Sequence, residues 1–537
     1  MHPDVNAHQG GSSCSTSHTA GSISPVESNE TEKKERFHTK CTPGEDLEAA
    51  SCQPTPQNSQ NGEKQTQDPM LVTWTGPDDP DNPKNWSTKK KWTATVLVSC
   101  FTFISPVSST LVAPALENIA NDFNITDQVV SELTLSIFVL AYALGPLVIG
   151  PLSEIYGRKM VLQVTNLFYI ILNTACGVSR STGQMIAFRF LAGIGGSAPM
   201  AIGGAVLGDC FRPEERGKAV SIYSLAPLLG PAVGPIAGAF VAERTTWRWV
   251  FYATSIAAGV IQIAGFLFLP ESHAPKILGE RARRIRKETG DASYQTEAER
   301  QRQNRGAVLR AALVRPLRLL TTQPIVQALA LYMGFIYGTM YLTMATFPTL
   351  WTSPEYYNES QGVGGLNYIS MGLGFILGAQ ICAILIDRIY RRMKHRNNDV
   401  GQPEFRVPIL GVAAFCMPVG LFIYGWTAQT HQHWIAPNIG IFIFGMGCIV
   451  GMQCIQTYIV DAYTRYAASA LAAAVLLRSL AGFSFPLFAP YMFQALSYGW
   501  GNSVLAFVSI GIGIPAPVLL WHFGSGLRRA SPFAAGG

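Results

Sequence analysis

One arginine lies deep inside an apolar stretch of the sequence. Arg478 is eleven residues into the apolar residues 467–491, which for an α-helix corresponds to a depth of about 16 Å, near the middle of a bilayer. No carboxylate lies at a similar depth in any apolar stretch. Its partners must therefore be carbonyls, hydroxyls, amides, an aromatic ring or an anionic substrate. The sequence predicts either a structural anchor or a substrate contact.

A second arginine and a glutamate lie close to the starts of two other apolar stretches. Arg189 is about one turn into residues 184–208, and Glu132 has a similar position in residues 129–149. Both stretches start on the same side of the membrane, so these side chains could meet. An arginine beside a carboxylate in a wet cavity would tune the proton affinity of that carboxylate. The alternative is that Glu132 lies among the lipid headgroups.

Several charged residues mark the opposite ends of the apolar stretches. Carboxylates at such positions can meet helix N-termini or arginines of another part of the bundle, and such contacts could close an inner gate. A solvated surface position is the alternative for each residue. The candidates for a gate are Glu154, Arg158, Asp209, Asp387, Arg388 and Asp461.

Aromatic and amide side chains are candidates for lining a substrate cavity. Tyr337 and Tyr341 are one turn apart on one helix face, and Tyr332 is displaced from that face. Gln453 and Gln456 add amides from another apolar stretch. Such a wall suits a bulky amphipathic organic molecule, although aromatic residues in membrane helices more often serve packing.

The elements that carry these residues are membrane helices. The chain has 537 residues, of which 48% are hydrophobic and only 14% charged, against roughly a quarter charged in soluble proteins. Apolar blocks of about 20 residues each, the length that a bilayer requires, predict an all-α polytopic membrane protein with twelve spans. The predicted spans are 93–115, 129–149, 160–178, 184–208, 218–241, 248–270, 323–350, 364–386, 406–428, 435–460, 467–491 and 498–523.

The spans divide the chain into five parts. A polar tail, residues 1–91, lacks the apolar content to pack and is predicted to be disordered, except near its end, 74–86. A six-helix bundle (92–270) and a second one (323–525) flank a basic cytosolic linker (271–322), and a short tail (526–537) follows. The ten cysteines are scattered, which predicts no disulfide framework and no metal site.

Lysine and arginine set the predicted orientation. They concentrate in the loops on one side of the predicted membrane and are nearly absent from the other side. The positive-inside rule then places both termini in the cytosol. The sequons at Asn124 and Asn358 fall in the outer loops, where they could be glycosylated. The net charge of +6 comes mainly from cytosolic loops and does not suggest nucleic acid as a partner.

Residues 225–241 (LAPLLGPAVGPIAGAFV) combine glycines and prolines at helical spacing. Pro231 and Pro235 each remove a helical hydrogen bond and favour a bend. Gly230, Gly234 and Gly238 form a smooth face with a spacing of one turn. The pattern predicts a bent helix in close contact with a partner helix.

The two halves resemble each other and a known family. GPLSEIYGRK at 150–159 and LIDRIYRR at 385–392 each place a carboxylate at the end of the second span of a half, followed by a tyrosine and then basic residues. Asp209 and Asp461 end matching spans. The first segment resembles the loop signature of the major facilitator superfamily, with Glu154 where an aspartate is more usual. LLGPAVGPIAG resembles its antiporter motif, and RFLAGIGGSAPMAIGG, which contains Arg189, resembles its fourth-span motif.

Further segments narrow the resemblance to one branch. NPKNWS, WRWVF, LPES and DAYTRYAASALAA are similar to the fungal twelve-span drug:H⁺ antiporters, over about residues 72–530. The resemblance implies the major facilitator fold, with a substrate path between two six-helix halves, and it ties Arg189 to proton transfer.

The sequence therefore predicts a secondary active transporter that exports a small organic molecule, such as a drug, toxin or secondary metabolite, by proton antiport. No GxxxxGK[ST] motif is present, so a proton gradient is the expected energy source and no cofactor is expected. No cluster of nucleophile, acid and base suggests an enzyme. The alternatives are proton-coupled uptake of a nutrient, polyamine or organic acid, and a non-transporting sensor.

The remaining expectations concern cargo, location and assembly. Arg189 and Arg478, with few buried acids, tilt the prediction slightly away from a cationic substrate. Family habit favours a monomer in the plasma membrane, with the vacuolar membrane as the alternative.

Overall fold

The computed structural model describes residues 70–212, 215–300 and 305–534. Eleven helical stretches in this part of the chain are long and apolar enough to cross a membrane. The last of them, residues 467–529, is 63 residues long and contains more than one rod. Of the predicted tail, residues 1–69 lie outside the described residues.

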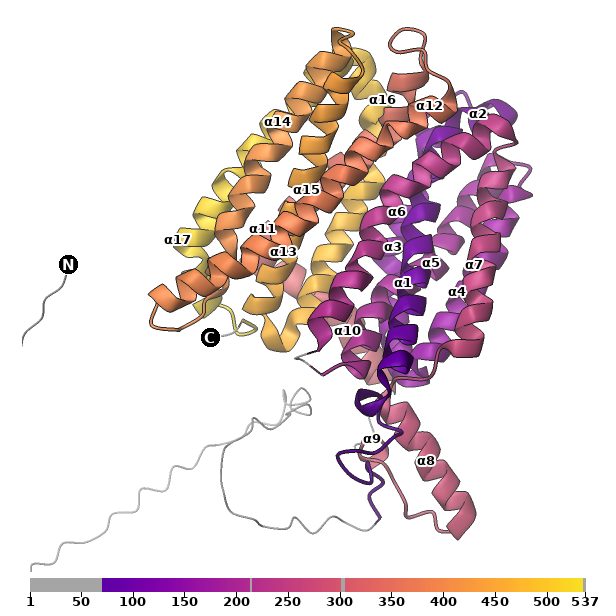
Figure 1. Cartoon of the computed structure of the whole chain (residues 1–537), viewed down its shortest axis with the longest axis vertical. Coiled ribbons are helices and arrows are strands. Elements are labelled where there is room, and N and C mark those ends of the chain that lie inside the picture. The colour runs from indigo at the N-terminus through magenta and orange to yellow at the C-terminus, as the bar shows by residue number, and fades with distance from the viewer. Residues whose placement is uncertain (1–69, 213–214, 301–304, 535–537) are drawn as a thin grey trace, which may run out of the picture. The chain divides into compact units, whose positions relative to one another are not determined.

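The first half of the chain supplies six long helices (Figure 1). They alternate in direction and are joined by short turns, and η1 (Pro83–Asn85) precedes them. Their bounds, with the short elements η2 and α2 between the first two, are α1 (Thr88–Thr110), η2 (Ala113–Ala115), α2 (Leu116–Asp122), α3 (Gln128–Tyr156), α4 (Arg158–Gly177), α5 (Thr182–Cys210), α6 (Arg216–Arg244) and α7 (Arg248–Phe268).

The second half repeats this arrangement after three linker helices. The linker helices are α8 (Ala274–Thr289), α9 (Glu297–Arg300) and α10 (Arg305–Thr322). The helices of the second half are α11 (Pro324–Thr352), α12 (Gln361–Leu366), α13 (Tyr368–Arg396), η3 (Pro403–Ile409), α14 (Leu410–Gln429), α15 (Ile435–Ala462), η4 (Thr464–Tyr466), α16 (Ala467–Gly513) and α17 (Pro515–Arg529).

Element α16 reverses direction near Ser497. This residue has φ 58° and ψ 177°, which no helix contains. Two neighbouring residues of α11 contact two distant residues of α16. A Cβ added at Gly334 would meet Leu477, and a Cβ added at Gly513 would lie 3.0 Å from the Tyr332 hydroxyl. Leu477 and Gly513 would be about 54 Å apart on a straight helix, so the chain must turn back between them. The reversal completes twelve membrane-crossing rods in two halves of six.

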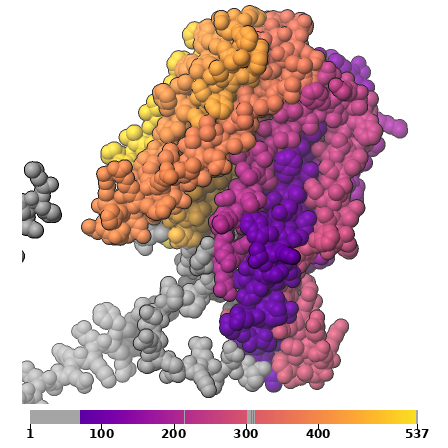
Figure 2. Space-filling view, viewed as in Figure 1, coloured from indigo at the N-terminus to yellow at the C-terminus, as the bar shows by residue number. Residues whose placement is uncertain are grey.

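The two ends of the bundle differ. We call the end from which α8 extends the linker end, and the end that carries α2 and α12 the distal end (Figure 1). Figure 2 shows the orange second half meeting the magenta first half close to the distal end. There the Gly362 N–H donates to Glu243 Oε2 at 2.7 Å, and the Gln361 amide donates to Asn118 at 3.4 Å.

The segment before α1 is bound to the linker. Asp79 accepts hydrogen bonds from the Thr75 N–H (2.9 Å) and Thr75 hydroxyl (2.8 Å), and it pairs with Arg281 of α8 at 2.7 Å. The Arg281 contact, followed by the Thr75 N–H, holds the pKa of Asp79 well below its usual range. Trp86 is buried in the same region. The contact of Asp79 with Arg281 thus ties the segment before α1 to α8.

The glycine face of α6 packs directly on α1. An added Cβ at Gly230 would lie 2.7 Å from Pro106, and one at Gly234 would lie 2.8 Å from the Val107 carbonyl. At Gly238 it would clash with the Leu111 carbonyl. The close approach that the glycine spacing predicts is present in the structure.

We expect Gly238→Ala to destabilise the protein, because the new methyl group must displace the α1 backbone. Overpacking of this kind typically costs about 1–3 kcal/mol. The matched control is Gly259→Ala in α7, where nothing lies within 4 Å of the added Cβ. Thermal unfolding of the two purified variants should separate them, and equal midpoints would contradict the tight α1–α6 contact.

Candidate functional site

Arg478 is a residue of α16 whose side chain reaches α11 and has no charged partner in the described part of the chain. Its side chain is 6% exposed, and the guanidinium lies over the Tyr337 ring, 4.6 Å from the ring centroid. Its Nε is enclosed and has no hydrogen-bond partner. Within the described residues it forms no ion pair. A ring face stabilises the cation but satisfies none of its N–H groups.

Hydroxyl groups from both halves meet close to this arginine. The Tyr337 hydroxyl donates to the Tyr341 hydroxyl at 3.4 Å, and the two rings lie 4.8 Å apart. The Tyr341 hydroxyl is 3.0 Å from Ser109 Oγ of α1 in the first half. We call Arg478, Tyr337, Tyr341 and Ser109 the central belt. It combines one cation, two aromatic rings and hydroxyls that can donate or accept.

Other predicted cavity residues have different surroundings. Tyr332 is buried in the core of the second half, where its hydroxyl faces Gly513 and Ala414. Its position on α11 turns it away from the face of Tyr337, and its role in a substrate cavity stays a prediction. Gln453 and Gln456 are half-buried on α15. That they line the substrate cavity stays a prediction.

Arg189 is completely buried in the first half and is bound by backbone carbonyls. Its Nη1 donates to the Ser108 carbonyl at 3.0 Å, and its Nε donates to the Thr134 carbonyl at 3.1 Å. Longer bonds of 3.4 Å reach the carbonyls of Ser109 and Leu135. Ser108 and Ser109 belong to the last turn of α1, whose carbonyls have no partner within the helix. The arginine thus ties α5 to α1 and α3.

Glu132 does not pair with Arg189, which corrects the expectation that the two side chains meet. All four hydrogen bonds of Arg189 are to carbonyls. Its guanidinium also lies 4.6 Å from the ring centroid of Phe138, which is one turn or more further into α3 than Glu132. Glu132 instead lines a cavity of about 940 Å³ at the distal end, between the two halves. The sequence placed both residues near one membrane face but could not give their depths.

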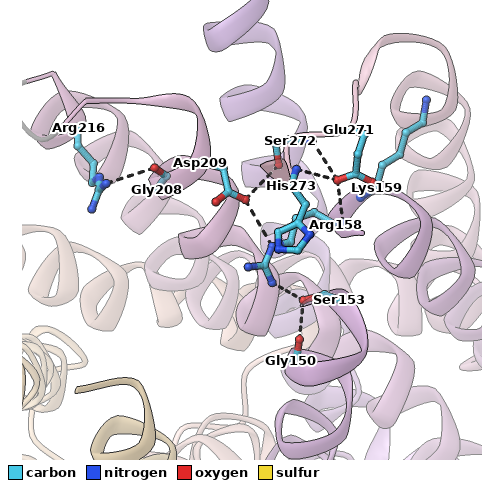
Figure 3. A network of polar contacts seen from close by, with 10 residues as sticks. All are labelled: Gly150, Ser153, Arg158, Lys159, Gly208, Asp209, Arg216, Glu271, Ser272 and His273. Carbon is cyan, nitrogen blue, oxygen red and sulfur yellow. Dashed lines mark hydrogen bonds and ion pairs between the residues drawn. The ribbon is translucent and has the colours of Figure 1, made fainter. Parts of the chain in front are cut away.

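A polar network surrounds Arg158 at the linker end of the first half (Figure 3). Arg158 Nη1 donates to Ser153 Oγ at 2.5 Å, and its Nε reaches Asp209 Oδ2 at 3.4 Å. The Ser272 hydroxyl donates to the same Asp209 oxygen at 3.5 Å. The network joins the ends of α3, α4 and α5 to the chain that leaves α7.

Glu271 caps the start of α4 in this network. It accepts from the N–H groups of Arg158 (2.9 Å) and Lys159 (3.2 Å), which are among the unpaired donors of a helix N-terminus. Gly157 permits the contact, since it has φ 96° and a Cβ there would clash with the Glu271 carboxylate. Nearby, burial and then the charge of Arg158 lower the pKa of His273 to about 4, so this imidazole is neutral at neutral pH.

Arg406 organises the linker end of the second half. Its Nη1 lies 2.8 Å from Asp387 and its Nε 2.9 Å from Asp461. The guanidinium also covers the Tyr390 ring at 4.3 Å. Asp209 and Asp461 therefore have matching partners. Each binds an arginine at or just before the start of the third membrane-crossing helix of its half, which is α4 in the first half and α14 in the second.

The gate candidates divide into two groups. Arg158, Asp209, Asp387 and Asp461 all form ion pairs, and each pair lies within one half. Glu154 and Arg388 are exposed and form no ion pair within the described residues. Arg406 is the basic partner of Asp387 and Asp461 in the second half, and a gating role for Arg388 stays a prediction.

Three functional residues were not singled out from the sequence. Glu271 lies in the LPES segment, which served only as a family marker. Arg406 lies in η3, after the arginines at the end of α13, and spacing alone could not select it. Glu404, which is 4% exposed, accepts two hydrogen bonds of 2.9 Å from Arg528.

The two sequon asparagines lie on exposed turns. Asn124 and Asn358 have φ values of 54° and 50°, which asparagine tolerates better than most residues. Both are on loops at the distal end, after α2 and after α11. A sugar could reach either side chain, and glycosylation itself stays a prediction.

We expect Arg406→Gln to destabilise the second half by about 1–3 kcal/mol, because it removes charged hydrogen bonds from two aspartates. Arg388→Gln is the matched control, since it removes the same charge one residue after Asp387 from an exposed side chain. The fraction of each purified variant that stays monodisperse after heating measures the effect. Equal heat resistance would show that the Arg406 pairs contribute nothing.

Comparisons with known proteins agree with this architecture. The model of the Major Facilitator Superfamily matches residues 98–486. The chain is 50% identical over 469 residues to the efflux pump vrtL of Penicillium aethiopicum, which covers 87% of this chain and 92% of the relative. It is 42% identical to the efflux pump radE of Floropilus chiversii, over 88% of this chain and 87% of the relative.

Solved structures show the same fold at low identity. The xylose transporter XylE of E. coli, in a partially occluded inward open conformation, has a TM-score of 0.60 and 15% identity, covering 81% of this chain and 98% of that one. A bacterial homologue of the lysosomal transporter Spinster, in an inward-facing conformation, has a TM-score of 0.61 and 14% identity, covering 83% and 100%. With two six-helix halves, the signature loop at 150–159 and relatives that span nearly its whole length, this multi-pass membrane protein belongs to the major facilitator superfamily of transporters.

Proposed function

We propose that the protein exports small organic molecules, neutral or anionic, from the cytosol in exchange for protons. The efflux pumps among its relatives support the direction of transport. The concentration of lysine and arginine at the linker end supports a cytosolic position for that end and for both termini. We further propose that it acts as a monomer in the plasma membrane, with the sequon loops outside.

The unpaired guanidinium of Arg478 carries the proposal for the substrate site. A charged side chain inside a membrane protein costs free energy unless something pairs with it. Arg189 shows how the protein satisfies such a group with carbonyls, and Arg478 has no such set. A substrate carboxylate, phenolate or carbonyl would complete its hydrogen bonds, while Tyr337 and Tyr341 would stack on an aromatic skeleton.

The contacts between the halves support a cycle of alternating access. The polar contacts described above that join the halves lie at the distal end and in the central belt. At the linker end, the ion pairs of Arg158 and Arg406 stay within their own halves. We propose that the distal contacts break when the substrate leaves, and that Glu154, Arg158, Asp209, Asp387 and Asp461 then help to close the linker end.

Proton exchange is assigned to Glu132. It lies in the distal cavity, which connects it to the outer solution in the proposed orientation. Arg189 holds α3, the helix of Glu132, against α1 and α5. This arginine would keep Glu132 in place while the halves move. The resemblance also ties Arg189 to proton transfer, and here the arginine would contribute by positioning α3, without a direct ion pair to Glu132.

Transport into inside-out vesicles tests this function. A panel of aromatic carboxylic acids and phenols is offered with an acidic vesicle interior, and accumulation is measured by mass spectrometry. At least one compound should accumulate only with the pH gradient. Arg478→Gln should reduce its accumulation at least about tenfold through the lost charged hydrogen bond.

The control variant is Arg283→Gln, which removes an exposed charge from α8 and should transport normally. Accumulation that ignores the pH gradient would contradict proton exchange. Accumulation unchanged by Arg478→Gln would contradict the substrate site.

A further inference from the structure

The distal cavity has a composition unlike that of the central belt. It is about 940 Å³ in volume and is lined by residues of η2, α2, α3, α11, α12, the start of α13 and the turn of α16, so that both halves contribute. Five carboxylates line it, and its lining contains no lysine, arginine or histidine. The acids are Glu117, Asp127 and Glu132 from the first half and Glu355 and Glu359 from the second.

These five acids have no basic partners. None of them forms an ion pair in the described part of the chain. Asp127 caps the Val129 N–H at 2.8 Å and lies 3.5 Å from the Tyr491 hydroxyl, and Glu359 accepts from Asn367 at 2.9 Å. Neutral donors of this kind leave the negative charges uncompensated. Within low-dielectric walls such a cluster attracts cations strongly.

Glu132 gives the cluster a specific binding point. Its side chain is 9% exposed, and its Oε2 has no hydrogen-bond partner. Buried carboxylates are normally paired or hydrogen-bonded. An unpartnered one that faces a cavity lined by four further acids marks the place where a positive group would be held.

Aromatic rings line the same cavity and indicate the kind of cation. Tyr356, Tyr368 and Tyr498 belong to its wall. Their positions are fixed, because the Tyr368 hydroxyl donates to the Met344 carbonyl at 2.6 Å and the Tyr498 hydroxyl donates to the Thr346 carbonyl at 3.2 Å. Ring faces attract organic ammonium and phosphonium groups.

A metal ion fits this cavity less well. No group of three or more His, Cys, Asp or Glu side chains in the described residues is close enough to hold a metal. The acids are instead distributed around a large volume, as a bulky cation with spread charge requires.

We propose that the distal cavity is a binding site for an organic cation, with Glu132 as its main anion and the tyrosines as its walls. The bound cation contacts both halves, because the carboxylates around it come from both. It therefore holds the distal end in its closed form. The site is separate from the central belt, where the charge is positive, and its occupant differs from the exported substrate.

Equilibrium binding of radiolabelled tetraphenylphosphonium to the full-length protein in nanodiscs tests the site, with empty nanodiscs as background. The wild type should bind saturably. Glu132→Gln, which preserves shape and removes the charge, should weaken binding at least about tenfold, since it deletes the one enclosed anion. Glu288→Gln on α8 is the matched control, because its exposed carboxylate lies outside the cavity, and its binding should equal that of the wild type.

A second variant covers the case in which Glu132→Gln fails to fold. The double substitution Glu117→Gln with Glu355→Gln changes two exposed residues at the mouth of the cavity and should also weaken binding severalfold. The absence of saturable binding to the wild type would overturn the proposal. Wild-type affinity in a folded Glu132→Gln, or in the double variant, would overturn it as well. None of these results depends on export, so the transport proposal is tested separately.

Discussion

A guanidinium inside a lipid bilayer must find partners for its N–H groups, and the two buried arginines of this protein meet that requirement in different ways. Arg189 has carbonyls from α1 and α3 around it, including those of the last turn of α1. It is a tie between helices, complete without a ligand. Arg478 has a tyrosine ring and no comparable acceptors. The same side chain thus serves packing in one half and remains available for recognition at the interface of the two.

The helix arrangement supports this difference. The glycine face of α6 packs on the last turns of α1, and Ser109 in the same part of α1 reaches Tyr341 across the two halves. The α1–α6 contact and this residue of the central belt thus share one stretch of α1. At the linker end, Arg158 and Arg406 bind aspartates of their own halves. Each half is held as a unit there, which is a requirement for rigid-body movement of one half against the other.

Much of the fold could be predicted from the sequence because lipid imposes a simple pattern. Apolar blocks of the right length predicted the membrane-crossing helices, and the spacing of Gly230, Gly234 and Gly238 predicted the close helix contact. The site was less accessible. Helical periodicity could show that Tyr332 is off the face of Tyr337 but not that it turns toward Gly513. Glu132 and Arg189 share a membrane face by sequence, and only the structure shows that carbonyls replace the carboxylate as partners of the arginine.

Ion-pair partners were the hardest to predict. Several arginines lie in the last turns of α13 close to Asp387, and the local sequence does not show which arginine binds this aspartate. The fold instead brings Arg406 from η3 between Asp387 and Asp461. Glu271 is similar, since its role as a cap for α4 depends on a contact across more than a hundred residues. Such pairs depend on how helices pack, which no local pattern encodes.

The account depends most on the claim that a ligand, and not the protein, completes the hydrogen bonds of Arg478. Ligand-dependent thermal stability of the purified protein tests this directly, because a compound that binds only the folded state raises the unfolding temperature, and tighter binding at a given concentration raises it further. A transported compound should raise the midpoint of the wild type and leave that of a folded Arg478→Gln variant unchanged. An equal rise in both proteins would show that the ligand binds elsewhere and would contradict the assignment of the central belt.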